Sequence, residues 1–424
     1  MLSLIFPVLV SLGADLPLVD PGRAPVLTMA SGRLRASGVP IVAVEQAGSA
    51  AAVVQLHVRT GTSERTLDEA RATWVFAAAL ADGRQKLPRD VSASDDVREA
   101  RGETRVAVDI DGFVVSDAVP AAAIDTALRA VEKRLARRKK LVVPATFPPR
   151  LAEAKGEIPH PARQLIAAGH TASFPLDEEA NPSPALFALL VDKTLRKDDV
   201  VLVVVGPEAP DKLIARAERA VRTPLPAGRG SATPLPPITG TRTIEGAEIP
   251  LDDAVFGAEV VAVYVPLARA SSSEGPEDPV AQRRTRAAEH VLAELSGIAL
   301  EERASFSVLS VVVRHPVDAR AFPEGVEKAA REPLAAIARA PVDDGVLDMA
   351  RRRTRARLLR KLSTPEGTAL VVGRAALKDG DAREAVALVD AVGAVTADAL
   401  VDVAARALAT GCVVASGTEV APWR

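Results

Sequence analysis

The two halves of the chain end in the same way. In each half a helical stretch leads into a β-branched strand, and the strand closes on a glycine, Gly206 or Gly417. The candidate N-caps of the two helices are Ser183 and Thr396. The two glycines lie about half of the 424-residue chain apart, which is a spacing typical of a duplicated domain. Because a chain of this length is too long for one hydrophobic core, we expect two tandem domains of the same fold.

Earlier elements repeat more loosely. Apolar strands are expected at Val53–Gly61 and Glu259–Ala268, later strands at Arg105–Val119 and Ser305–Pro316, and helices at Ala121–Lys139 and Glu324–Arg339. Strands separated by helices within one half predict an α+β fold, in which each half is an antiparallel sheet packed with helices. A Pro- and Gly-rich stretch at residues 223–242 is expected to be a linker. It separates an N-terminal domain at residues 25–222 from a C-terminal domain at 243–424.

Composition excludes several classes of function. The formal net charge is −2, which argues against a general nucleic-acid binder, since such proteins carry a basic excess. One cysteine, Cys412, can form neither an internal disulfide nor a cysteine-based zinc site. No G-x-S-x-G elbow and no phosphate-binding glycine motif is present. We therefore expect no nucleic-acid partner.

The N-terminus resembles a signal peptide. Leu2–Ala14 is an uncharged apolar run that ends in small residues, and the first basic residue is Arg23. Such a run is too short to span a bilayer but matches the apolar region of a secretory signal. We expect a signal peptide at residues 1–20 and export, in a bacterium to the periplasm. No later stretch is apolar over about 18 residues, so no further membrane span is expected.

Histidines and basic runs carry little signal by themselves. None of the five histidines pairs with another at the spacing that places two imidazoles on one helix face, so each is expected to be a surface or locally hydrogen-bonded residue.

The basic runs Lys133–Lys140 and Arg351–Lys361 are interpreted as solvated helix faces. For the second run, a surface that steers acidic peptides or a partner is the alternative.

From about Leu34 onward the chain resembles the insulinase and mitochondrial-processing-peptidase family of zinc peptidases (pitrilysin type). The opening strand pair ends in a V-R-x-G-type turn at Val58–Thr62. The resemblance implies that a metal helix with the motif H-x-x-E-H follows, and that its closing glycine is Gly83. In that register the first histidine falls on Trp74, the catalytic glutamate on Ala77 and the second histidine on Ala78.

These three residues cannot perform the family's chemistry. Two imidazoles one helical turn apart must bind Zn²⁺, and a carboxylate must take the proton from the bound water. An indole and two methyl groups can do neither, but they can pack. The stretch from Ala70 to Gly83 contains no histidine and no glutamate in any register. We therefore expect a helix that keeps its structural place and has lost its catalytic groups, so no metal or other cofactor is expected.

Other site positions implied by the resemblance are also altered. Glu157 retains the position of the third metal ligand, while the earlier acidic position is Arg150. In the second half the family has an arginine and a tyrosine that grip the substrate. Here Phe306 takes the tyrosine position, Ala299 takes the arginine position, and Arg303 can substitute only with a local shift.

The resemblance implies a catalytically inactive subunit that pairs with an active homologous zinc peptidase and encloses peptides. Three alternatives stay open: an active zinc endopeptidase with displaced ligands, a structural core-type subunit of a larger complex, and an unrelated two-domain binding protein.

Overall fold

A computed structural model of the chain describes residues 27–59, 67–84, 91–109, 112–141, 194–228, 240–250, 259–268, 278–302, 306–314 and 322–420. The predicted signal peptide, the N-cap candidate Ser183, Gly61 and most of the linker lie outside these residues. Within the described part no helix is both long and apolar enough to cross a membrane.

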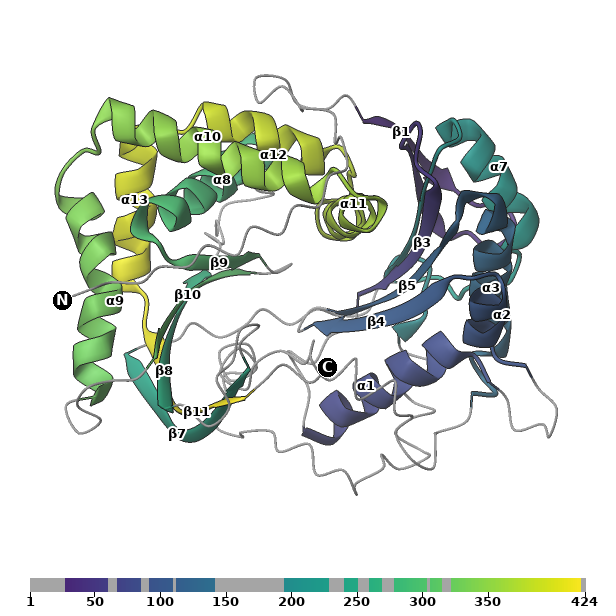
Figure 1. Cartoon of the computed structure of the whole chain (residues 1–424), viewed down its shortest axis with the longest axis horizontal. Helices are drawn as coiled ribbons and strands as arrows, with labels where there is room; N and C mark the ends of the chain where they lie inside the picture. Colours follow the sequence, from purple (N-terminus) through teal and green to yellow (C-terminus); the bar gives the residue numbers. More distant parts are fainter. Residues whose placement is uncertain are drawn as a thin grey trace, which may run out of the picture.

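Two sheets form the framework (Figure 1). The first has the order β1-β2-β6-β3-β5-β4, from strands β1 Thr28–Arg33, β2 Pro40–Glu45, β3 Ala51–Val58, β4 Glu103–Asp109, β5 Gly112–Pro120 and β6 Val200–Gly206. The second has the order β7-β11-β8-β10-β9, from strands β7 Thr241–Pro250, β8 Glu259–Ala268, β9 Ala299–Glu302, β10 Phe306–Arg314 and β11 Cys412–Val420.

The two sheets have the same topology once β1 is set aside. In each, the first strand pairs in parallel with the last (β2 with β6, β7 with β11), and the remaining neighbours are antiparallel. The shared strand order confirms the predicted α+β fold of two similar halves. Each sheet is mostly antiparallel, as predicted, and contains in addition one parallel pair. In the first half the partner strands of this pair come from sequence positions far apart, so the pairing leaves no local signal.

Helices cover the first sheet on both faces. In the first half the helices are α1 Leu67–Asp82, α2 Ala93–Glu99, α3 Ile124–Arg137 and α7 Pro210–Ala220, with a 3-10 turn at Ala121–Ala123 before α3. In the second half they are α8 Pro279–Ser296, α9 Phe322–Arg339, α10 Asp344–Lys361, α11 Pro365–Asp379, α12 Glu384–Gly393 and α13 Ala397–Ala409. Figure 1 shows α3 and α7 on the outer side of the first sheet and α9 and α13 on the outer side of the second.

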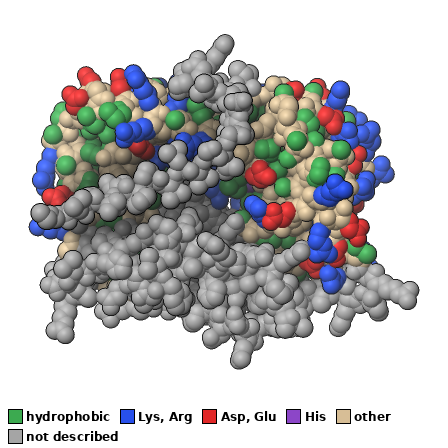
Figure 2. All heavy atoms as spheres, viewed as in Figure 1, with side chains coloured by type: hydrophobic (Ala, Val, Ile, Leu, Met, Phe, Trp, Pro, Cys, Tyr) green, Lys and Arg blue, Asp and Glu red, His purple; other side chains and the backbone are tan. Residues whose placement is uncertain are grey.

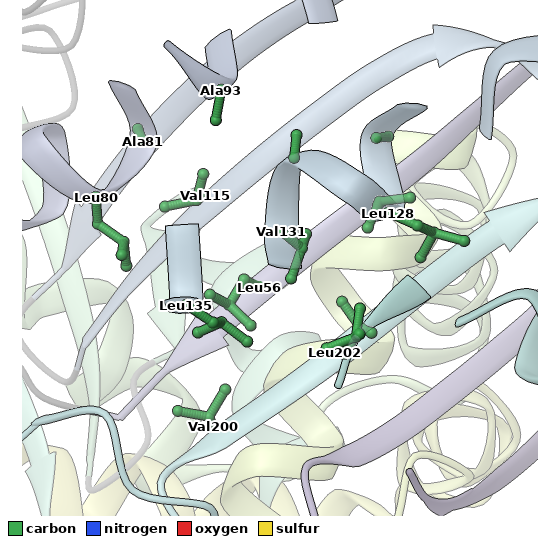
Figure 3. Close-up of a cluster of buried hydrophobic side chains, with 14 of the residues drawn as sticks. Leu56, Leu80, Ala81, Ala93, Val115, Leu128, Val131, Leu135, Val200 and Leu202 are labelled. Carbon is green, nitrogen blue, oxygen red and sulfur yellow. The ribbon is translucent and has the colours of Figure 1, made fainter. Parts of the chain in front are cut away.

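Strand β6 shows how the two faces are filled. All seven of its residues are buried, and successive side chains point to opposite faces. Val200, Leu202 and Val204 join the core formed with α1 and α3, part of which is drawn in Figure 3. Val201, Val203 and Val205 instead pack with Ala369 and Val372 of α11. A helix of the second half therefore covers the inner face of the first sheet, which explains the continuous apolar run of β6.

Two local expectations are confirmed and one is corrected. Strand β8 has the predicted bounds, and Thr396 caps α13 by accepting a hydrogen bond from the backbone N–H of Ala399 at 3.2 Å. The single strand expected over Arg105–Val119 is wrong, because it is a hairpin of β4 and β5. The dipeptide Asp111-Gly112 is a turn signal that marks this break.

Candidate functional site

Helix α1 occupies the place of the expected metal helix, directly after β3 in the chain and packed on β4 and β5. It spans Leu67–Asp82. Val75, Phe76, Ala77 and Ala78 are all at most 5% exposed, so the side chains at the expected positions of the catalytic glutamate (Ala77) and the second histidine (Ala78) lie in the hydrophobic core. The phenyl ring of Phe76 meets that of Phe113 in β5 edge to face, with centroids 5.8 Å apart. Trp74 lies in the same helix, and its side chain is outside the described part.

The residues at this position do not fit a zinc ion. Methyl groups at Ala77 and Ala78 supply no lone pair for a metal and no base for water. In the described part of the chain, no group of three or more His, Cys, Asp or Glu side chains lies in a metal-binding arrangement. Glu157, Arg150 and Arg303 fall outside the described residues, so the third-ligand position and the substitution by Arg303 stay predictions. Phe306 begins β10, opposite Ala268 of β8.

A buried ion pair holds the C-terminal end of α1 in place. Both Arg134 of α3 and Asp117 of β5 have fully buried side chains, and both terminal nitrogens of the guanidinium donate to the Asp117 carboxylate. The Nε of Arg134 also donates to the backbone carbonyl of Ala81 in α1 at 2.8 Å. The interpretation of the whole run Lys133–Lys140 as solvated is therefore wrong for Arg134. A buried charge must be paired, and the partner of Arg134, 17 residues away in strand β5, is not visible in the local sequence.

The helix ends on Gly83, as the sequence predicted. Its φ of 65° is in the left-handed region that favours glycine. A Cβ here would lie 2.9 Å from the Cβ of Ala93. Arg137 donates to the Gly83 carbonyl at 3.0 Å, which satisfies one of the last acceptors of the helix. Helix α1 is thus a fixed structural element at both its buried face and its C-terminal end.

A cavity of about 350 Å³ lies between the halves, on the inner face of the first sheet. Its walls come from β3, β4 and β5 on one side and from α8, α10, α11 and α12 on the other. Apolar side chains make up much of the lining, among them Phe113, Leu358 and Leu388. This volume is at the lower end of the range found for small-molecule sites. This cavity leaves no signal in the sequence, because its lining residues come from elements spread over most of the chain.

The charged residues of this lining all have the same sign. They are Arg59, Arg286, Lys361, Arg374 and Lys378, and we call this set the cationic cluster. Among the described lining residues there is no aspartate or glutamate. Arg286 forms an ion pair with Asp379 at 3.0 Å just outside the lining. Figure 2 shows Lys and Arg atoms where the two halves meet.

His57 and His290 also line this cavity. His57 is 1% exposed and its Nε2 lies 2.9 Å from Oε1 of Gln55, which confirms the expectation of a locally hydrogen-bonded histidine. Burial and the charge of Arg374 lower the pKa of His57 to about 3, so the imidazole is neutral at physiological pH. A neutral imidazole adds no charge to the cavity.

No family model matches the chain, and no curated protein matches it. Several solved structures are similar to the chain. A protease from Helicobacter pylori is similar with a TM-score of 0.68 and 12% identity, over 92% of this chain and 99% of that chain. The inactive domain of a peptidase M16 from Pseudomonas fluorescens gives a TM-score of 0.63 and 14% identity, over 93% of this chain and 98% of that chain. A chain of complex III2 from Candida albicans gives a TM-score of 0.65 and 10% identity, over 92% of this chain and 95% of that chain. The chain therefore has the M16 peptidase fold.

Proposed function

We propose that this chain is a catalytically inactive M16-type subunit, which pairs with an active zinc peptidase of the same fold and helps to enclose peptides. The observation that carries the proposal is the burial of Ala77 and Ala78 in α1. In the register of the insulinase and processing-peptidase family these positions hold the catalytic glutamate and a zinc ligand. Here they fill the core of the first half, so the helix has a packing role in place of a catalytic one.

The solved structures support this reading of the fold. One similar structure is described as the inactive domain of an M16 peptidase, so the fold occurs without catalysis in that protein. A chain that keeps both sheets and the cavity between them retains a surface for binding although its metal helix is apolar. In this proposal an active partner supplies the zinc chemistry, while this chain forms part of the wall that encloses peptides and part of the surface that binds them.

Native mass spectrometry of the protein purified gently from its own cells, with metal analysis of the same sample, tests the pairing. We expect a one-to-one complex with a second chain that carries an intact H-x-x-E-H motif, and zinc that follows the second chain when the two are separated. A solitary chain would contradict the pairing. A single zinc ion that stays with this chain would favour the rival, an active peptidase with displaced ligands.

A second candidate function is a structural subunit of a larger complex. The observation that favours it is the similarity to a chain of complex III2 from Candida albicans. Co-purification with a stable assembly that contains no peptidase would support this function over the first.

Export belongs to the proposal as well. The run Leu2–Ala14 predicts removal of about the first 20 residues, and N-terminal sequencing of the mature protein checks it. Detection of an intact N-terminus in cytoplasmic material would contradict export.

A further inference from the structure

The cationic cluster brings charges of one sign from both halves of the chain to one cavity. Arg59 directly follows β3 in the first half, and Arg286 and Lys361 belong to α8 and α10 of the second. Arg374 and Lys378 are four residues apart on α11, so they lie on one face of that helix. Because α11 covers the inner face of the first sheet, these two residues stand at the junction of the halves.

The cavity lining carries charged side chains of one sign beside apolar walls, where electrostatic interactions are stronger than in bulk water. A cleft lined by charges of one sign also focuses the electric field and raises the local concentration of counter-ions. Arg286 is held by Asp379, which orients its guanidinium through an ion pair with both side chains 13% exposed. The cluster therefore includes at least one cation that is fixed in position beside the cavity.

The apolar side chains of the lining indicate that the uncharged part of a ligand is apolar. Aliphatic side chains from α10, α11 and α12 and the ring of Phe113 surround the same space. Ligand sites combine apolar walls with a few placed polar groups, which fix the orientation of the bound molecule. Guanidinium groups bind carboxylates well because their N–H donors match the two carboxylate oxygens.

We propose that the cavity between the halves binds an organic carboxylate with an apolar body, through the cationic cluster and the aliphatic walls. Two sources share this chemistry, a free fatty carboxylate and the acidic side chains or C-terminus of a short peptide. The peptide source deepens the proposed function and rests on it, whereas the free carboxylate does not. In either case the ligand contacts both halves and stabilises their arrangement.

Isothermal titration calorimetry on the isolated full chain tests this. The probes are decanoate, a tetrapeptide of alternating leucine and glutamate with a free C-terminus, and the amidated leucine–glutamine counterpart of that peptide. We expect at least one of the two anionic probes to bind, with an affinity that falls as salt is raised. The uncharged peptide is expected to bind at least tenfold more weakly than the acidic one. Binding of decanoate indicates a free fatty carboxylate as the ligand, and binding of the acidic peptide indicates a short peptide.

Two variants with the same change in charge assign the site. Arg374→Gln/Lys378→Gln is expected to weaken binding at least tenfold. Arg352→Gln/Arg353→Gln removes two exposed charges of α10 that do not line the cavity, and is expected to leave the affinity unchanged. Thermal unfolding of both variants checks that they are folded, and Lys361→Gln provides a milder variant of the cavity.

Absence of binding by both anionic probes at millimolar concentration would overturn the proposal. Equal weakening by both double variants would also overturn it, since that result indicates a general effect of net charge. Neither outcome bears on pairing with an active peptidase, which is measured by native mass spectrometry, so the two proposals fail independently.

Discussion

Gly373 of α11 lies directly against the imidazole of His57 in β3. A Cβ at Gly373 would be 2.1 Å from Nε2 and 2.4 Å from Cε1 of the ring, a separation at which one of the two groups must move. The contact joins the two halves, since β3 belongs to the first sheet and α11 to the second half of the chain. Glycine at this helical position therefore allows α11 to approach the sheet closely.

Gly373→Ala tests the closeness of this contact. Although alanine favours the helix, overpacking against the buried ring is expected to destabilise the protein by about 1–3 kcal/mol. Chemical denaturation measures the free energy of unfolding. Gly393→Ala is the matched control, because a Cβ at this helical glycine of α12 meets nothing within 4 Å. The control is expected to be neutral or stabilised by up to about 1 kcal/mol. Equal effects of the two substitutions would contradict the close approach of α11.

His57 gives the stability of the chain a pH dependence. Its pKa is about 3 in the folded protein, against 6.5 for a solvated histidine, so the unfolded chain binds more protons between these two pH values. The stability that depends on the neutral imidazole is complete above pH 6.5 and is lost as the pH falls toward 3. Between pH 6.5 and 5 the loss is about 2 kcal/mol.

Comparison with His57→Gln isolates this contribution from that of the other acidic and basic groups. Denaturation at pH 7 and pH 5 should show a smaller loss of stability for the variant than for the unchanged chain. The same loss in both proteins would show that His57 does not titrate as its buried position requires.

The Arg134–Asp117 ion pair is expected to be sensitive to the removal of one partner. Arg134→Met leaves a buried carboxylate without its cation, at a cost of about 3–5 kcal/mol in the free energy of unfolding. Arg129→Met, at an exposed position of the same helix, should change it by no more than about 0.5 kcal/mol.

A second substitution measures the coupling within this pair. The double variant Arg134→Met/Asp117→Leu is expected to recover at least half of the loss, because it removes both buried charges. Additive losses in the double variant would mean that the two groups do not interact.

Phe76 tests the structural role of α1. Phe76→Ala removes a fully buried ring and its edge contact with Phe113. The expected loss of stability is about 3–5 kcal/mol, measured by chemical denaturation. Phe76→Leu, which keeps most of the buried volume, should lose less than half of that amount. A loss below about 1 kcal/mol for the alanine variant would show that α1 is not packed as described.

Elements with local signals were predictable from the sequence. Strand β8 is a continuous apolar run, and the hydroxyl of Thr396 marks the start of α13. Helix α1 ends at Gly83, where a left-handed residue is needed. The similarity of the halves was also visible, because each ends in a helix, a β-branched strand and a glycine. These features depend on residues within a few positions of one another.

Features that depend on distant partners were not predictable. The burial of Arg134 in α3 depends on Asp117 in β5, and the parallel pairing of β2 with β6 joins segments far apart in the chain. The continuous apolar run of β6 indicates that both faces of this strand are buried, yet nothing in the run identifies α11 as the helix that covers its inner face. The cationic cluster as a set had no signal in the sequence, since its members come from separate parts of the chain and only Lys361 belongs to the basic run Arg351–Lys361. Only the fold brings their charges together.

We propose that helix α1, at the position expected for the metal helix, carries no zinc chemistry. Zinc content and peptide hydrolysis of the purified full chain, measured on the same sample with and without a chelator, test it most directly. We expect less than about a tenth of a zinc ion per chain, the background of adventitious metal, and no hydrolysis that the chelator removes. One tightly bound zinc ion per chain, together with hydrolysis that the chelator abolishes, would contradict it.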